Sequence, residues 1–208
     1  MIFFDFDGVL IDSNGVWLQV DYDFAAKRGL EVTEEYTYAM GHSIFPIAAQ
    51  FARDYYHLPD TPEEIMAEWR SLAYDAYAHT IPLKPGALEL LEKLKARGED
   101  MALLTAGLPE LAKAAFERHG LGRYLSGIFF AHEAGMEKKN PELYRVAARK
   151  YGLSPADCTL CEDAPYNCAA AKEAGFTVIG VYDDFYQNAW EDVVKNSHRA
   201  VKSLTELL

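Results

Sequence analysis

Short apolar runs recur along this chain, and each is followed by a polar or glycine-containing turn and then by a helical pattern. Runs that are apolar throughout, without alternating polar residues, are typical of strands that helices cover on both faces. The repeated order of strand and helix therefore predicts an α/β protein with a Rossmann-like, doubly wound parallel sheet. The predicted strands cover residues 2–4, 101–104, 127–131, 159–161 and 176–182.

Helices are predicted between the later strands. Residues 85–97 place Leu88, Leu91 and Leu94 at a spacing of three, and the Gly98 that follows is typical of a helix end. Three further segments carry a proline in the expected first helical turn, where its missing N–H is not needed. These three helices are predicted over residues 109–119, 141–151 and 165–174.

Residues 15–80 break this alternation. They contain no convincing strand and show helical periodicity rich in alanine and aromatic residues. The segment follows the first predicted strand and ends at a stiff, proline-rich connector, residues 81–86. We therefore expect a core domain formed by residues 1–14 and 81–208, with residues 15–80 inserted as a helical domain. The helices predicted in the insertion cover residues 17–28, 44–56 and 62–78.

Composition and charge narrow the class of protein. Of 208 residues, 50% are hydrophobic, which is enough for one substantial core and excludes a disordered chain. The chain has 32 acidic and 20 basic residues, so its net charge is −12. We therefore expect neither nucleic acid nor an anionic membrane as a partner. No apolar run approaches the roughly 20 residues that span a bilayer, and the first ten residues lack the basic region of a signal peptide. Three cysteines cannot all pair, so a reducing, cytoplasmic location is predicted.

Polar residues follow the predicted strands at the edge of the sheet where ligands of this architecture bind. Asp5 and Asp7 follow the first strand, Thr105 follows the second, and Glu162 with Asp163 follows the fourth. Further polar residues after the third and fifth strands are His132, Glu133, Lys138, Lys139, Asp183 and Asp184. We expect acids from two strand ends, one hydroxyl and one lysine to meet at this edge.

These residue types favour phosphoryl transfer. Asp5 and Asp7 are two residues apart, so both carboxylates point the same way in an extended chain. Bringing Glu162 and Asp163 beside them is unfavourable unless a cation lies between, and an all-oxygen ligand set suits Mg²⁺. A carboxylate that stays free to attack phosphorus forms an acyl-phosphate, while its neighbour transfers protons. Thr105 is a candidate donor to the phosphoryl oxygens, and a lysine offsets their charge.

Four segments then resemble, in order, the motifs of the haloacid dehalogenase-like (HAD) hydrolases. They are Phe-Asp-Phe-Asp-Gly at residues 4–8 and on to Ser13, Leu-Leu-Thr-Ala-Gly at 103–107, Lys-Lys-Asn-Pro-Glu-Leu-Tyr at 138–144, and Cys-Glu-Asp at 161–163, which continues to Gly175. The resemblance covers essentially the whole chain. The helical insertion between the first two motifs is similar to the cap of the subgroup that holds phosphoglycolate phosphatase and β-phosphoglucomutase.

The resemblance implies a role for each matching residue. Asp5 is the expected nucleophile and Asp7 the expected general acid and base. The expected phosphate and substrate ligands are Thr105, Ala106, Gly107 and Lys138. The implied Mg²⁺ is held by Asp5, the main-chain carbonyl of Asp7, and Asp163, with Glu162 as a further ligand or as a partner of the ligands. An aspartate at position 7 argues against true dehalogenation, because that branch of the family lacks it.

Two residues depart from the family pattern. Lys139 stands where a proline is usual, so two lysines are adjacent; the distance to Pro141 favours Lys138 over Lys139 as the phosphate ligand. Ala164 replaces a frequent serine after the acidic pair. In the cap, His42 lies between predicted helices. It is a candidate for substrate recognition, and the alternative is that it is a solvated loop residue. The residues after it lack the arginine frequent in β-phosphoglucomutases, which weakens the mutase alternative.

The sequence thus predicts a Mg²⁺-dependent phosphatase that hydrolyses a small phosphorylated metabolite through an aspartyl-phosphate, as a monomer or homodimer. One alternative is a sugar phosphomutase with the same intermediate, in which a sugar hydroxyl takes the place of water. The other is a non-catalytic phosphate-binding module. Asp5 and Asp7 as turn formers, and Glu162 and Asp163 as helix caps, are the structural alternatives for the acids.

Overall fold

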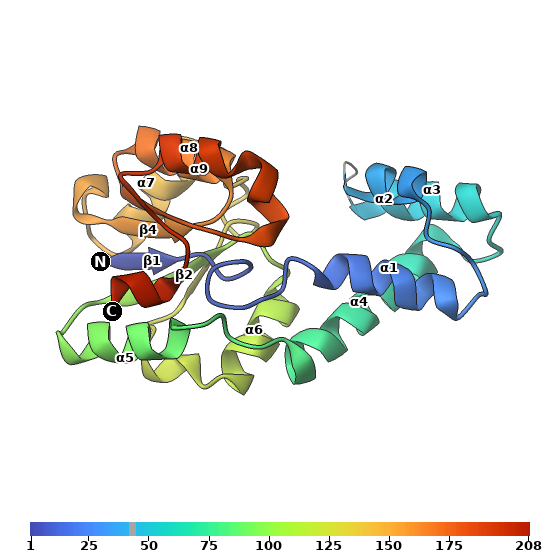
Figure 1. The fold of residues 1–208 in the computed structure, drawn as a ribbon, viewed down its shortest axis with the longest axis horizontal. Helices are drawn as coiled ribbons and strands as arrows, with labels where there is room; N and C mark the ends of the chain where they lie inside the picture. Colours follow the sequence, from blue (N-terminus) through green and yellow to red (C-terminus); the bar gives the residue numbers. More distant parts are fainter. Residues whose placement is uncertain (42–44) are drawn as a thin grey trace. The chain divides into compact units, whose positions relative to one another are not determined.

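The computed structural model of the chain describes residues 1–41 and 45–208. A parallel sheet with the strand order β3-β2-β1-β4-β5-β6 lies at its centre (Figure 1). The order reverses beside β1, which confirms the predicted α/β class and the doubly wound parallel sheet. The strands are β1 (Ile2–Phe4), β2 (Met101–Thr105), β3 (Ile128–Phe130), β4 (Thr159–Glu162), β5 (Thr177–Val181) and β6 (Arg199–Val201).

The predicted strands are all present, and their ends differ from the prediction by no more than one residue. All of Met101–Thr105 is buried, as expected for a central strand that is covered on both faces. β6 was not predicted. It is a three-residue strand at the sheet edge that opens with an exposed arginine, so it lacks the apolar run that marks the others.

Helices cover both faces of this sheet, with α7, α8 and α9 on one face and α5 and α6 on the other (Figure 1). They are α5 (Ala87–Ala96), α6 (Pro109–Arg118), α7 (Pro141–Lys150), α8 (Pro165–Ala174) and α9 (Trp190–Asn196). Short 3₁₀ turns occupy Leu121–Arg123, Pro155–Asp157, Asp184–Ala189 and Leu204–Leu207. Three of the helices begin at the proline that predicted them, whereas α9 was not predicted.

The main core lies between the sheet and α7 and α8. Phe3, Leu160 and Val178 from three strands belong to one buried cluster with Tyr144 of α7. Cys158 and Cys168 belong to the same cluster, and all three cysteines, including Cys161, are buried free thiols. This packing fixes the strand ends that carry the polar residues described below.

The chain divides into two compact units, one of residues 1–14 and 81–208 and one of residues 15–80. Among the residues that the structure describes, the regular elements of the second unit are all helices, which confirms a helical insertion after β1. It contains α1 (Val16–Ala26), α2 (Glu34–Gly41), α3 (Phe45–Tyr56), α4 (Pro62–Asp75) and a π-helix (Ala76–Thr80).

The insertion has its own core of aromatic residues. Trp69 and Tyr36 are buried, and Phe24 meets the Trp69 ring edge-on at a centroid distance of 5.6 Å. α4 begins with a capping box in which Thr61 and Glu64 satisfy each other's main-chain N–H groups. The insertion is therefore a packed unit with defined helix ends.

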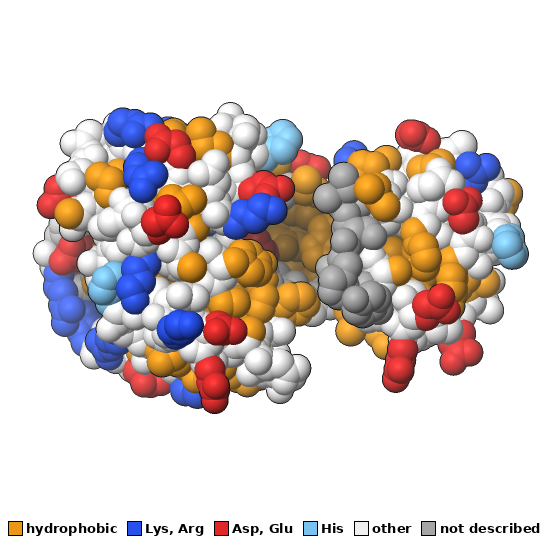
Figure 2. Space-filling view, turned by 90° about the horizontal axis from the view of Figure 1, so that it is seen from above, with side chains coloured by type: hydrophobic (Ala, Val, Ile, Leu, Met, Phe, Trp, Pro, Cys, Tyr) orange, Lys and Arg blue, Asp and Glu red, His pale blue; other side chains and the backbone are white. Residues whose placement is uncertain are grey.

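The surface carries both signs of charge, and Figure 2 shows acidic and basic side chains interspersed over the face that it presents. Among the described residues, no helix is long and apolar enough to cross a bilayer.

Candidate functional site

Three adjacent strands, β2, β1 and β4, bring predicted site residues to one edge of the sheet. Asp5 directly follows β1, while Thr105 and Glu162 are the last residues of β2 and β4. The Asp5 N–H extends the ladder by donating to the Cys161 carbonyl at 2.9 Å. Because parallel strands end at the same edge, Asp5, Thr105 and Glu162 lie there together, and all three are buried.

Lys138 lies between two of these acids. Its ammonium is 2.7 Å from Oδ2 of Asp5 and 2.5 Å from Oε2 of Glu162, and its side chain is 4% exposed. The adjacent Lys139 instead pairs with Glu137, and both of those side chains are exposed. The structure thus brings Lys138, and not Lys139, into the cluster.

Glu162 is held by hydrogen bonds at both carboxylate oxygens. Oε2 accepts from Lys138, and Oε1 accepts from the main-chain N–H groups of Asp163 at 3.2 Å and Ala164 at 3.0 Å. Burial alone would raise the pKa of Glu162, but the Lys138 ammonium and these donors hold it below its usual value. Glu162 therefore stays charged and fixes both Lys138 and the turn into α8.

Asp5, Glu162 and Asp163 form a compact acidic cluster, in which each places one oxygen within 4.8 Å of the others. Burial, reinforced by the charge of Glu162, raises the pKa of both Asp5 and Asp163 well above the usual value. Lys138 supplies one positive charge to three carboxyl groups, and its own pKa is raised by Asp5 and Glu162 against the effect of burial. A buried set of oxygen donors with excess negative charge fits a divalent cation such as Mg²⁺.

Asp7 lies on the side of the site nearest β2. Its Oδ1 accepts from the Ser13 hydroxyl at 2.6 Å. A Cβ on Gly107 would lie 3.1 Å from Oδ2 of Asp7 and 3.1 Å from the Thr105 hydroxyl, so the loop after β2 closely approaches both. The Thr105 hydroxyl accepts from the Gly107 N–H at 2.9 Å, which leaves its proton for another acceptor.

Asn14 is a site residue that the sequence analysis missed. Its amide donates to Oδ2 of Asp163 at 2.8 Å and to Oδ1 of Asp183 at 3.1 Å, so it links the ends of β4 and β5. Gly8 lies beside this contact with φ of +77°, and a Cβ there would lie 2.2 Å from Oδ2 of Asp163. The position of Asn14 directly after the first motif was the one available signal.

Lys84 is the second residue that was missed. Its ammonium donates to the Gly8 carbonyl at 2.9 Å, to the Tyr182 carbonyl at 3.2 Å and to Oδ2 of Asp183 at 2.5 Å. The loop that carries Asp7 is therefore tied to the end of β5. Lys84 belongs to the connector before α5, where a lone lysine gave no sign of this role.

A cavity of about 110 Å³ opens at this edge of the sheet. Its lining residues are Asp5, Asp7, Asn14, Ala106, Gly107, Lys138, Asp163, Ala164, Asn167 and Tyr186. Predicted residues from all four motifs therefore lie in or beside one cavity, with Thr105 and Glu162 buried at the strand ends next to it. His42, the candidate from the insertion, lies outside the described residues.

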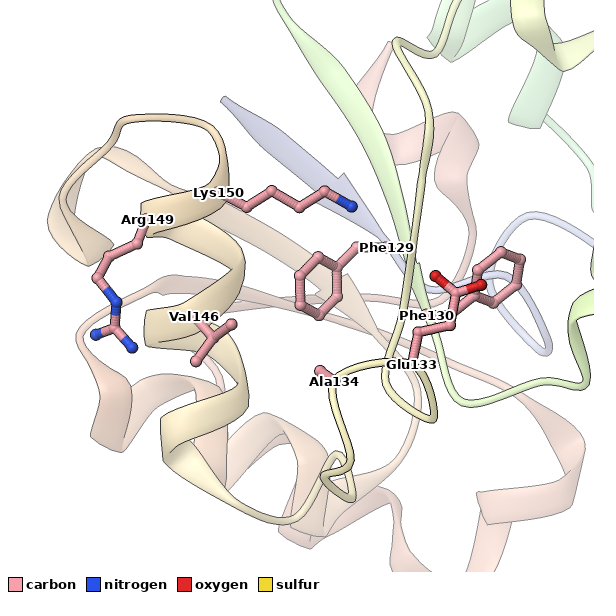
Figure 3. A pocket seen from close by; sticks show the side chains of 7 residues that line it. All are labelled: Phe129, Phe130, Glu133, Ala134, Val146, Arg149 and Lys150. Carbon is pink, nitrogen blue, oxygen red and sulfur yellow. The ribbon is translucent and has the colours of Figure 1, made fainter.

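A second cavity, of about 500 Å³, lies at the β3 edge of the sheet (Figure 3). Phe129 of β3 faces Val146 and Lys150 of α7, whereas the Phe130 ring points away from α7 (Figure 3). Its one acid, Glu133, follows β3 as expected, but it lines this cavity and not the one that Asp5 lines. The larger cavity holds no predicted nucleophile or metal ligand, so the smaller one is the candidate site.

The chain is similar to several characterised phosphatases. It is 27% identical over 207 residues to hexitol phosphatase B of Escherichia coli O157:H7, covering 98% of this chain and 92% of that protein. It is 29% identical over 181 residues to hexitol phosphatase A of Escherichia coli strain K12, covering 86% and 81% of the two chains.

Solved structures share the fold. The crystal structure of a putative β-phosphoglucomutase from Thermotoga maritima matches with a TM-score of 0.85 and 22% identity, over 99% of this chain and 97% of that one. The sequence pattern of the haloacid dehalogenase-like hydrolases matches residues 1–175, which include every residue that lines the candidate cavity except Tyr186. This chain belongs to the haloacid dehalogenase-like hydrolases.

Proposed function

We propose that the chain is a Mg²⁺-dependent phosphatase that hydrolyses a small phosphomonoester through an aspartyl-phosphate on Asp5. The observation that carries the proposal is the position of the Asp5 carboxylate. It lines the same cavity as Asp7, and its Oδ2 lies 2.7 Å from the Lys138 ammonium. A buried carboxylate held by a cation beside a second acid is suited to covalent phosphoryl transfer.

Two groups are placed to bind the phosphoryl oxygens. The Thr105 hydroxyl accepts from Gly107, so its own proton can be donated to a phosphoryl oxygen. The Lys138 ammonium supplies positive charge while Glu162 keeps it in place. Both are buried, which strengthens their electrostatic effect on a charged transition state.

The acidic cluster is the proposed metal site. Asp5, Asp163 and the main-chain carbonyl of Asp7 would hold Mg²⁺, and Glu162 would support them, because both of its oxygens already accept hydrogen bonds. When bound there, the ion neutralises charge on the phosphoryl oxygens and on the carboxylates. Asn14 orients Asp163 by donating to its Oδ2.

The covalent and proton-transfer steps then involve only the two aspartates, the ester and water. An oxygen of Asp5 attacks phosphorus, the bond from phosphorus to the ester oxygen breaks, and Asp7 donates a proton to the leaving alcohol. Asp7 next takes a proton from a water molecule, whose oxygen bonds to phosphorus as the bond to Asp5 breaks. Inorganic phosphate leaves, and both aspartates return to their starting states.

Phosphate release from a panel of small phosphomonoesters tests the proposal. The similarity to hexitol phosphatases makes hexitol phosphates the first compounds to assay. We expect turnover that needs Mg²⁺, stops with chelator and is lost in Asp5→Asn. Asp12→Asn is the matched control, because Asp12 is an exposed aspartate of the same loop, and it should retain turnover.

The outcome also separates the alternatives. Isomerisation of a sugar phosphate that a bisphosphate stimulates, with little phosphate release, would replace the phosphatase by a mutase. No turnover of any compound by folded protein with Mg²⁺ present would reject the enzyme and favour a phosphate-binding module.

A further inference from the structure

Asn167 carries a buried polar atom that no described residue satisfies. The residue is 6% exposed, and its Oδ1 has no hydrogen-bond partner among residues 1–41 and 45–208. A buried acceptor without a donor is unfavourable, and most such atoms in folded proteins are paired. A buried amide oxygen of this kind points to a ligand that supplies the missing donor.

Asn167 faces the candidate active site. It is the third residue of α8 and lines the same cavity as Asp5 and Asp163. Ala164, at the start of that helix, has no side-chain group that could bond the first turn, so Asn167 is the polar side chain that this turn presents to the cavity. The unpaired acceptor and the proposed nucleophile therefore share one small space.

Tyr186 lines the cavity as well and brings a second polar group. Its hydroxyl lies 2.6 Å from the Tyr166 hydroxyl, and either hydroxyl can be the donor of this hydrogen bond. When Tyr166 donates, the Tyr186 proton is available to a ligand. Burial raises the pKa of Tyr186, and the hydrogen bond to Tyr166 adds to the effect, so the phenol stays protonated.

The chemistry of these groups selects the kind of ligand atom. A phosphoryl dianion has no proton to give, so it does not satisfy Oδ1 of Asn167. A hydroxyl group does, because it donates to the amide oxygen and accepts from the phenol at the same time. In the proposed mechanism, Thr105 and Lys138 already bind the phosphoryl group.

We propose that Asn167 and Tyr186 form a subsite for a hydroxyl group of the leaving alcohol, so that the substrates are polyhydroxylated phosphomonoesters. This inference rests on the proposed phosphatase function and deepens it. It places part of the substrate specificity on α8 and the turn after β5, outside the helical insertion.

A matched pair of substrates tests the subsite. Glucitol 6-phosphate and n-hexyl phosphate have six carbons and one phosphate each, but only the first has free hydroxyl groups. The quantity to measure is selectivity, the ratio of kcat/KM for glucitol 6-phosphate to that for hexyl phosphate. Because a buried acceptor loses its donor when the hydroxyl is absent, Asn167→Leu should lower this ratio about 10- to 100-fold.

Two further variants support the reading. Tyr186→Phe should also lower the ratio, and it provides the test if Asn167→Leu does not fold. Asn188→Leu, an exposed asparagine two residues after Tyr186, should leave the ratio unchanged. A fall in kcat/KM that is equal for both compounds, or a weaker response to Mg²⁺, would overturn the subsite, because Asn167 would then act on the phosphate or on metal-bound water.

The subsite and the phosphatase can fail separately. If the unaltered protein releases phosphate from both compounds but Asn167→Leu keeps its selectivity, the subsite is wrong and the phosphatase stands. If neither these two compounds nor any other member of the panel is turned over, the phosphatase fails. Calorimetric binding of the two compounds to Asp5→Asn, with and without Asn167→Leu, then decides the subsite by itself: equal losses of affinity would overturn it.

Discussion

The ammonium of Lys138 lies 2.5 Å from Oε2 of Glu162, and neither side chain is more than 4% exposed. One residue further along the chain, Lys139 pairs with Glu137 at 2.6 Å, with side chains 69% and 70% exposed. Two adjacent lysines thus make ion pairs of nearly equal length in opposite environments. Comparing the two pairs separates the effect of burial from the effect of charge on activity and on stability.

Lys138→Met should abolish most activity, whereas Lys139→Met should not. Removing the buried ammonium takes away the positive charge beside Asp5, and the loss of one such group typically lowers kcat about 10²- to 10³-fold. Phosphate release at saturating Mg²⁺ measures both variants. Equal rates in the two would show that Lys138 has no part in the reaction.

Glu162→Gln should destabilise the protein, because it leaves the Lys138 charge buried with a weaker partner. Breaking a buried ion pair from one side costs about 3–5 kcal/mol in free energy of unfolding. Glu137→Gln makes the same change in the exposed pair and should leave the urea midpoint unchanged. A Glu162→Gln midpoint equal to that of the unaltered protein would mean that Glu162 does not stabilise this region.

The sheet and the acidic cluster were predictable because their signals are local. An apolar run predicts a buried strand, and Asp5, Thr105 and Glu162 come directly at or after such runs. Parallel pairing then brings them together without further information. β6 and α9 have no such local signal, because both are short and mix polar with apolar residues.

The supporting residues were not predictable, because their contacts join distant parts of the chain. Lys84 donates to residues 76 and 99 positions away, and Asn14 reaches Asp163 across 149 positions. Lysine and asparagine are also ordinary surface residues in connectors, so the residue type does not indicate a role in the site. Asn167 was missed for a related reason: only the structure shows that its oxygen is buried and has no partner in the described part of the chain.

Gly8→Ala should destabilise the protein more than Gly98→Ala. Both glycines have similar left-handed backbones, with φ of +77° and +79°. At Gly98 a Cβ meets no described atom within 4 Å, so alanine there costs only the backbone strain, about 1–2 kcal/mol. At Gly8 the new methyl group would lie 2.2 Å from Oδ2 of Asp163 and 2.3 Å from the Asn14 amide.

The added overlap at Gly8 should cost a further 1–3 kcal/mol, about the usual cost of overpacking, and should displace Asp163. Urea denaturation measures the difference between the two variants, and phosphate release measures the damage to the site. Equal destabilisation, with activity retained by Gly8→Ala, would contradict the tight contact among Gly8, Asn14 and Asp163.

Asp21 should make stability depend on pH. It is buried in α1, where burial raises its pKa to about 6, although the Tyr36 hydroxyl at 3.2 Å opposes the shift. Because the folded pKa is the higher one, the folded protein binds this proton more tightly than the unfolded chain does. The stabilisation is complete below pH 3.8, the unfolded value, and is lost as the pH rises through about 6.

Asp21→Asn removes the ionisation and keeps an acceptor for Tyr36. Above pH 7 it should be more stable than the unaltered protein by about 2–3 kcal/mol, and near pH 4 the two should be nearly equal. Free energies of unfolding at both pH values give the comparison. Asp23→Asn, at an exposed position of the same helix, is the matched control. A constant difference for Asp21→Asn would mean that Asp21 titrates normally.

Mg²⁺ should stabilise the unaltered protein against heat through the acidic cluster. A ligand that binds only the folded state at about 100 times its Kd adds about 2.7 kcal/mol, which for a chain of this size raises Tm by about 5–10 °C. Asp163→Asn removes one of the three clustered carboxylates and should abolish most of the increase. Asp157→Asn, an exposed aspartate before β4, should keep it. An increase that survives Asp163→Asn would place the bound ion somewhere other than between Asp5 and Asp163, and the mechanism would then need a different source of positive charge at the phosphoryl group.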